Sequence, residues 1–306
     1  MLFRSEQSAS ADRQVWALAL IADEYRGSRQ LSLASDYANA ARSLGEAQLP
    51  NPHPVLASAF HAVGAVAREQ GRLVDAKVAL NQALKIDATG QGRSKVDQVA
   101  TMFHLANVEY DSGDYLAAKE ISLRLLAFSD SELGESAGNT AAVHRLAVFA
   151  TERAGEFEEA QRLVDRYMGP DLGAPQPTRA GGAHMAVARV AMSLGNLTAA
   201  NAALIRADEL LRANTLWAGR AGALRGELAL RFGDPHAAAK LLGEIRARQV
   251  AAFGADSAEL AATDEWLGVS YARMAAASEA STHFANSCRL RAIVRPHHHP
   301  QRIRCD

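Results

Sequence analysis

Aromatic residues are scarce in this chain, at only 6% of 306 residues. An all-β sandwich needs β-branched and aromatic side chains in its strands, so the composition argues against that class. Alanine is abundant instead, with 64 residues. Because alanine is the best helix former and lets neighbouring helices approach closely, the composition favours an all-α chain.

The chain also lacks an excess of charge of one sign. Its 33 Lys and Arg balance 34 Asp and Glu, which leaves a net charge of −1. Nucleic acids and anionic membranes attract proteins through concentrated positive patches, so we expect neither as a partner. The one basic end holds Arg289, Arg291, Arg295, Arg302 and Arg304, and we interpret it as a solvated terminus.

Cysteine and long apolar runs are nearly absent as well. Cys288 and Cys305 are the only cysteines, which excludes a disulfide framework and a cysteine-based zinc site. No stretch reaches 18 uninterrupted apolar residues, and the N-terminus lacks the apolar segment of a signal peptide. We therefore expect a cytoplasmic protein in a reducing compartment.

What the chain does contain is a repeat. A glycine followed five residues later by an alanine recurs along the sequence, and the sixth copy has Ala275 in the glycine place. The alanines of the six copies lie 38 to 42 residues apart, at positions 76, 118, 160, 200, 238 and 280. A fixed period of this length is typical of repeat architectures.

The motif predicts a helical hairpin. Apolar residues recur with helical spacing before each glycine, and a second amphipathic stretch follows, as over Leu73 to Ile86. Glycine ends the first helix because it adopts a positive φ at no steric cost. Alanine allows the two helices to cross closely. One hairpin cannot cover its own apolar stripe, so the hairpins must stack on one another.

Residues 12–46 are predicted to form a degenerate first hairpin, which brings the total to about seven. We expect a single solenoid over residues 1–295, followed by a flexible tail over 296–306. The strongest helix breaker lies at 169–182, where Gly169-Pro170 is followed by two further prolines. It is interpreted as a long inter-repeat loop, with a joint between subdomains as the alternative.

Neither end of the predicted solenoid shows an obvious solvating cap, which solenoids require. Two explanations stay open. The chain is part of a longer protein, or its bare ends are buried by self-association.

These features resemble the tetratricopeptide repeat, in the long-period variety of kinesin light chains. The resemblance rests on Gly64, Gly71, Leu73 and Ala76, and on their counterparts in the following repeats. It implies a right-handed superhelical solenoid whose first helices line a concave groove. Members of this family bind proteins or peptides in that groove.

The resemblance also implies which side chains line the groove. They mix arginine and histidine with aromatic residues, and comprise His61, Arg68, Phe103, His104, Asn107, Tyr110, Arg145, Phe149, Arg189 and Trp266. A peptide with an acidic or amide-rich segment suits such a surface, because arginine makes bidentate contacts and aromatics act as anchors. The alternative is a solvated face whose side chains only pack between repeats.

Catalysis finds no support in the sequence. It contains no HExxH, CxxC or GxSxG pattern. His144 and His184 occupy one repeat position and are interpreted as packing or surface residues, and Gly181-Gly182 as part of a loop. We expect no enzyme activity, metal or cofactor, and predict a protein- or peptide-binding scaffold. The alternative function is a sensing module of a larger signalling protein, such as a transcription regulator or kinase, whose effector domain is absent from this chain.

Overall fold

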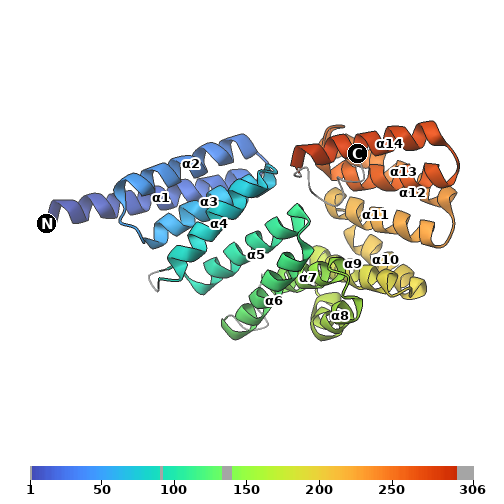
Figure 1. Ribbon diagram of the computed structural model, residues 1–306, viewed down its shortest axis with the longest axis horizontal. Helices are drawn as coiled ribbons and strands as arrows, with labels where there is room; N and C mark the ends of the chain where they lie inside the picture. Colours follow the sequence, from blue (N-terminus) through green and yellow to red (C-terminus); the bar gives the residue numbers. More distant parts are fainter. Residues whose placement is uncertain (1, 90–91, 133–139, 295–306) are drawn as a thin grey trace. The chain divides into compact units, whose positions relative to one another are not determined.

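The computed structural model describes residues 2–89, 92–132 and 140–294, which are all helices and their connections (Figure 1). The predicted all-α class is confirmed, since the described residues contain no strand. The α-helices are α1 (Leu2–Gly27), α2 (Leu31–Gln48), α3 (Pro54–Glu69), α4 (Leu73–Asp87), α5 (Lys95–Ser112), α6 (Tyr115–Glu132), α7 (Thr140–Arg153), α8 (Phe157–Leu172), α9 (Pro177–Ser193), α10 (Leu197–Leu211), α11 (Thr215–Arg231), α12 (Pro235–Phe253), α13 (Ala261–Arg273) and α14 (Ala277–Val294). A short 3-10 helix, η1 (Ala258–Leu260), precedes α13. The tail predicted at 296–306 lies outside the described residues.

The helices form two compact units. Unit 1 contains α1 to α6, and unit 2 contains α7 to α14, with the boundary at residues 137–138. The odd-numbered helices from α1 to α11 each pack on the even-numbered helix that follows. α13 is joined to α14 by a hydrogen bond from Oγ of Ser287 to the carbonyl oxygen of Ala261. Odd-numbered helices of consecutive hairpins also touch, as α1, α3 and α5 do in unit 1 and α7, α9, α11 and α13 do in unit 2. The predicted helical hairpins are thereby confirmed, three in unit 1 and four in unit 2, and we call the odd-numbered helices the first helices. A single solenoid over residues 1–295 stays a prediction.

The glycines of the motif have the backbone conformation that the sequence predicts. Gly71, Gly113, Gly155, Gly195 and Gly233 all have φ between 75° and 87°. Ala275 takes the same place with φ 60°. The alanine five residues further on is fully buried in every copy except Ala280, which is 5% exposed.

The repeat extends into the first hairpin, which the sequence analysis treats as degenerate. Arg29 has φ 64° and ends this first helix as the glycines end theirs. Ala34 follows five residues later and is fully buried. The phase of the motif therefore runs through all seven hairpins.

In every hairpin except that of α7 and α8, which has Val148, a small residue stands seven positions before the turn and brings the two helices together. A Cβ added at Gly64 would lie 2.5 Å from Leu80, and one added at Gly226 would lie 2.6 Å from three atoms of Leu242. Gly268 would meet Phe284 at 2.7 Å in the same way. Side chains of the second helix thus fill the space that glycine leaves.

The loop predicted at 169–182 is shorter than expected. α8 continues through Pro170 to Leu172, and α9 begins at Pro177, so only four residues connect them. Gly181 and Gly182 are buried within α9, and their assignment to a loop is wrong. Pro170 lies exposed in the last turn of α8, where loss of one backbone hydrogen bond costs little. A joint at this place stays a prediction.

Two further findings bear on the expected location. None of the described helices is both long and apolar enough to cross a membrane. Cys288 in α14 is disulfide-bonded, whereas the sequence predicts a reducing compartment. The reducing, cytoplasmic location therefore stays a prediction.

Candidate functional site

All ten predicted groove residues lie on first helices and are partly exposed. Unit 1 holds His61 and Arg68 on α3 and the four from Phe103 to Tyr110 on α5. Unit 2 holds the remaining four. We define the first-helix face of each unit as these partly exposed side chains together with their equivalents on the other first helices of that unit.

Two neutral histidines lie side by side in unit 1. The rings of His61 and His104 meet edge to face at 5.2 Å, and Phe103 stands 6.0 Å from His104. Nδ1 of His61 lies 2.8 Å from Oγ1 of Thr101. Burial, together with the charge of Arg93, lowers the pKa of His61 to about 4, and burial holds the pKa of His104 well below its usual value. This pair is therefore uncharged at neutral pH and works as a packing contact.

Arg68 and Asn107 are engaged within the protein. Nε of Arg68 donates a hydrogen bond to Oδ2 of Asp111 at 2.7 Å, and Nη2 lies 3.5 Å from Oδ1 of Asn107. Nδ2 of Asn107 donates to the carbonyl oxygen of Phe103 at 2.7 Å. Both side chains thus tie one first helix to the next or to itself.

Such ties recur along the first helices. Nη1 of Arg26 donates to Oε1 of Glu69 at 2.6 Å, one repeat before the equivalent pair of Arg68 with Asp111. In unit 2, Nη1 of Arg231 donates to the carbonyl oxygen of Met192 at 3.0 Å. Arg68, one of the predicted groove residues, therefore belongs to a series of hydrogen bonds that join one first helix to the next.

The structure adds two residues that the sequence analysis missed. Leu20 on α1 stands two repeats before His104 and so occupies a first-helix face position of the first hairpin. Trp16 lies one turn before Leu20 on the same side of α1, and the two side chains are 54% (Trp16) and 46% (Leu20) exposed. The period carries the signal for them, because Ala34 stands 42 residues before Ala76. Arg29 stands where five of the later copies have glycine, so the glycine pattern does not reveal the copy in the first hairpin.

Two arginines in unit 2 lie over aromatic rings. The guanidinium carbon of Arg189 is 5.6 Å from the ring centre of Phe149, and its Nη2 donates to Oε2 of Glu152 at 2.8 Å. The guanidinium carbon of Arg145 is 5.6 Å from the ring centre of Trp217. Arg220 approaches the same tryptophan ring at 5.5 Å. Cation–π pairs of this kind hold guanidinium groups at a defined place on a surface.

Trp266 is the exception among the predicted residues of unit 2. It packs against the buried cluster that contains Leu230, Leu242 and Leu267. Because Trp266 packs into the hairpin core, less of its ring surface is accessible to a partner.

The two histidines that occupy one repeat position have different surroundings, since His144 faces a buried carboxylate and His184 does not. Asp171 is fully buried, lies 2.6 Å from Nη2 of Arg179 and faces His144 at 3.6 Å. Burial acts to raise the pKa of this carboxyl, but His144 and Arg179 outweigh it and lower the pKa. His184 is partly exposed. Within the described ranges, no group of three His, Cys, Asp or Glu residues is arranged to hold a metal ion.

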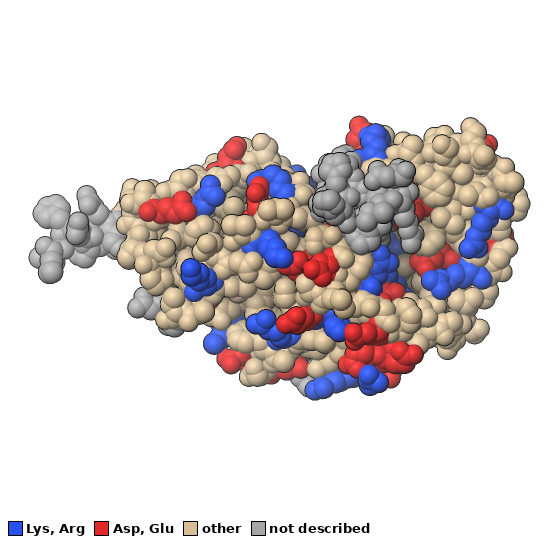
Figure 2. Space-filling model, in the orientation of Figure 1, with Lys and Arg blue, Asp and Glu red and all other residues tan. Residues whose placement is uncertain are grey.

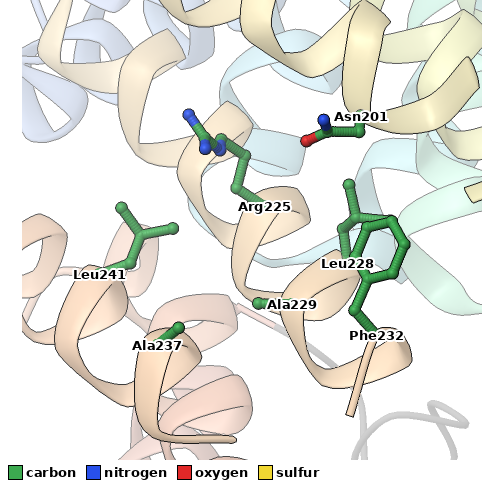
Figure 3. A pocket seen from close by; sticks show the side chains of 7 residues that line it. All are labelled: Asn201, Arg225, Leu228, Ala229, Phe232, Ala237 and Leu241. Atoms are coloured by element: carbon green, nitrogen blue, oxygen red, sulfur yellow. The ribbon is translucent and has the colours of Figure 1, made fainter. Parts of the chain in front are cut away.

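A shallow pocket of about 280 Å³ lies between α10, α11 and α12 (Figure 3). Leu228 and Phe232 from α11 form one wall, Leu241 from α12 another, and Arg225 and Asn201 stand at the polar edge. Small-molecule sites usually exceed about 300 Å³. Arg225 is also paired with Asp208, so the pocket presents no unsatisfied charge to a ligand.

Basic and acidic side chains are interspersed on the molecular face that Figure 2 shows. This mixture agrees with the nearly zero net charge of the chain. No large patch of one sign is present on that face among the residues described.

Comparisons with known proteins identify the fold class. RapI in its apo form superimposes with a TM-score of 0.72 at 14% identity, covering 92% of this chain and 98% of that one. A Rap protein in complex with Competence and Sporulation Factor gives a TM-score of 0.68 at 15% identity over 92% and 76%. Repeats of a kinesin light chain-like protein from Podosopora anserina give 0.57 at 17% over 67% and 98%.

The fold is thus that of tetratricopeptide-like repeat proteins, as the sequence resemblance implied. No family model matches the sequence, and a search of curated proteins also finds no match.

Proposed function

We propose that this chain is a non-enzymatic scaffold that binds a protein or peptide on its first-helix face. The observation that carries the proposal is the exposure of Trp16, one turn before the exposed Leu20 of the first-helix face of unit 1. Tryptophan contributes more binding free energy than most residues at protein interfaces. Leaving such apolar surface in water forfeits the free energy that its burial would provide.

The neighbouring structures support this proposal through one case. The Rap protein named above was solved with Competence and Sporulation Factor bound to it. A stack of helical hairpins similar to this one therefore holds a partner in at least one protein. The regulatory-module alternative requires the same first step, since a sensor must also bind its signal.

A selection from a displayed library of random 12-residue peptides tests the proposal. The full chain is immobilised as wild type, as Trp16→Ala and as Val74→Ala. Val74 is the matched control because it is also apolar and exposed, at 74%, but lies on the second helix α4. We expect enriched peptides from wild type and from the control, and about tenfold weaker binding of those peptides by Trp16→Ala.

Two results would contradict the scaffold proposal. Wild type would enrich no peptide, or Trp16→Ala would bind the enriched peptides as well as Val74→Ala does. Circular dichroism of all three variants ensures that the comparison is made between equally folded proteins.

A further inference from the structure

The two arginine–aromatic pairs of unit 2 differ in one respect. Arg189 lies over Phe149 and has a carboxylate partner in Glu152. Arg145 lies over Trp217, but its Nη1 is buried without a hydrogen-bond partner. The protein therefore supplies a counter-charge to one guanidinium and no direct counter-charge to the other.

The nearest negative charge to Arg145 is already engaged. Asp171 acts on Arg145 through space, and its carboxylate is hydrogen-bonded to Arg179. Burial lowers the pKa of Arg145, with Asp171 opposing and Arg179 adding to the effect. A guanidinium keeps its charge under such conditions because its pKa starts far above neutrality. Arg145 is thus a partly desolvated cation, which gains more from an added carboxylate than a cation in water does.

Glycine in the neighbouring helix allows this placement. A Cβ on Gly182 of α9 would lie 3.0 Å from Cδ and Nε of Arg145, so the side chain passes directly over the glycine. Arg145 starts on α7 and reaches Trp217 on α11 by this path. Three consecutive first helices of unit 2 build the arrangement.

A second cation completes it. Arg220 approaches the same ring of Trp217, and its Nη2 stands 3.4 Å from both carboxylate oxygens of Glu259. That separation exceeds the 2.7 to 2.9 Å of a strong charge-assisted hydrogen bond. Arg220 thus has a carboxylate partner at a longer distance, whereas Arg145 has no carboxylate partner among the described residues.

We propose that Arg145, Trp217 and Arg220 form a binding site for a side-chain carboxylate of an acidic peptide. The exposed part of the Arg145 guanidinium group pairs with the carboxylate. Trp217 holds both guanidinium groups in place through its cation–π contacts. This inference rests on the proposed function, because it specifies the chemistry of a partner on the first-helix face.

The test uses an array of paired nine-residue peptides. Both members of a pair share one random sequence, with glutamate at the centre of one and glutamine at the centre of the other. Labelled full-length protein is applied as wild type, Arg145→Gln and Arg162→Gln. Arg162 is the charge-matched control, since it is 70% exposed on the second helix α8.

We expect wild type and Arg162→Gln to bind the glutamate member of the best pairs about tenfold more tightly than its glutamine twin. In Arg145→Gln that ratio falls to about one. Gly182→Ala provides a second variant that keeps all charges, and its new Cβ displaces the Arg145 side chain. The same fall in the ratio is expected there.

The outcomes separate this inference from the scaffold proposal. Peptides that bind wild type without a preference for glutamate would overturn the carboxylate site and leave the scaffold intact. Retention of the preference by Arg145→Gln and by Gly182→Ala would overturn the site as well. Absence of binding to every peptide would count against both proposals.

Discussion

Ala275, like Arg29, is a motif turn residue that has a positive φ but is not glycine, and its conformation carries a measurable cost. Its φ is 60°, in a conformation that an L-residue with a Cβ adopts only at a cost of about 1 kcal/mol. Ala275→Gly is therefore expected to raise the free energy of unfolding by about 0.5–1 kcal/mol, measured by urea denaturation.

Ala272→Gly is the matched control for this effect. Ala272 is exposed within α13, where glycine destabilises a helix by about 1 kcal/mol. The same substitution three residues apart should thus change stability in opposite directions. Equal destabilisation by both would show that the turn at Ala275 stores no strain.

His61 makes the stability of unit 1 depend on pH. Its pKa is about 4 in the folded protein because burial and Arg93 disfavour the charged form, against 6.5 for an ordinary histidine. Below pH 6.5 the unfolded chain binds a proton that the folded chain does not. The stabilisation present above pH 6.5 is therefore lost as the pH falls toward 4.

We expect His61→Gln to reduce the loss of stability between pH 7 and pH 5 by about 1–2 kcal/mol, measured by urea denaturation at each pH. The exposed His236 serves as control, and His236→Gln should keep the wild-type pH dependence. An unchanged pH dependence in His61→Gln would contradict a neutral, buried His61.

For single residues, the sequence predicts backbone conformation better than it predicts which side chains form hydrogen bonds or ion pairs. A glycine five residues before an alanine is visible in the sequence, and the positive φ follows from it. That Arg68 would engage Asp111, 43 residues away, depends on the register of two stacked helices. The predicted groove residues thus lie on first helices, as the repeat implies, but their hydrogen-bond partners were not predictable.

At the scale of a helix, glycine has opposite effects at two positions of one hairpin. A Cβ at Gly226 of α11 would lie 2.6 Å from three side-chain atoms of Leu242, whereas one at Gly243 of α12 would meet nothing within 4 Å. Gly226→Ala should destabilise the protein by about 1–3 kcal/mol through overpacking. Gly243→Ala should stabilise it by up to about 1 kcal/mol through helix propensity.

Thermal denaturation of wild type and the two variants measures both the expected loss and the expected gain of stability. A double variant tests whether packing is the cause, because Leu242→Ala removes the side chain that the new Cβ at position 226 would meet. Gly226→Ala should therefore cost less in a Leu242→Ala background than in wild type. Additive effects would rule out direct contact between the two positions.

Helix ends show what local patterns miss. Glycine and proline at 169–170 predict a break, yet α8 continues to Leu172. Asp171 explains the difference, since this buried residue in the last turn is held by Arg179 from the following helix. Tertiary ion pairing here outweighs local propensity, and no pattern within α8 reveals it.

At the scale of the whole molecule, stacking restricts each hairpin to contacts with its neighbours, so local damage should stay local. Leu204 is fully buried in the cluster of α9, α10 and α11 in unit 2. Leu204→Ala removes about 2–5 kcal/mol of packing free energy. Hydrogen exchange measured by mass spectrometry should accelerate in α9 to α11 and remain unchanged in α1 to α4 of unit 1.

Leu80→Ala provides the reciprocal experiment, because Leu80 is fully buried in the cluster formed by α3, α4 and α5. Its exchange should accelerate in those helices and leave α10 to α12 protected. If either variant instead accelerated exchange uniformly from α1 to α14, the chain would unfold as one cooperative body. Stability would then not be a sum of hairpin and nearest-neighbour terms, and a partner bound to one unit would stabilise the whole chain equally.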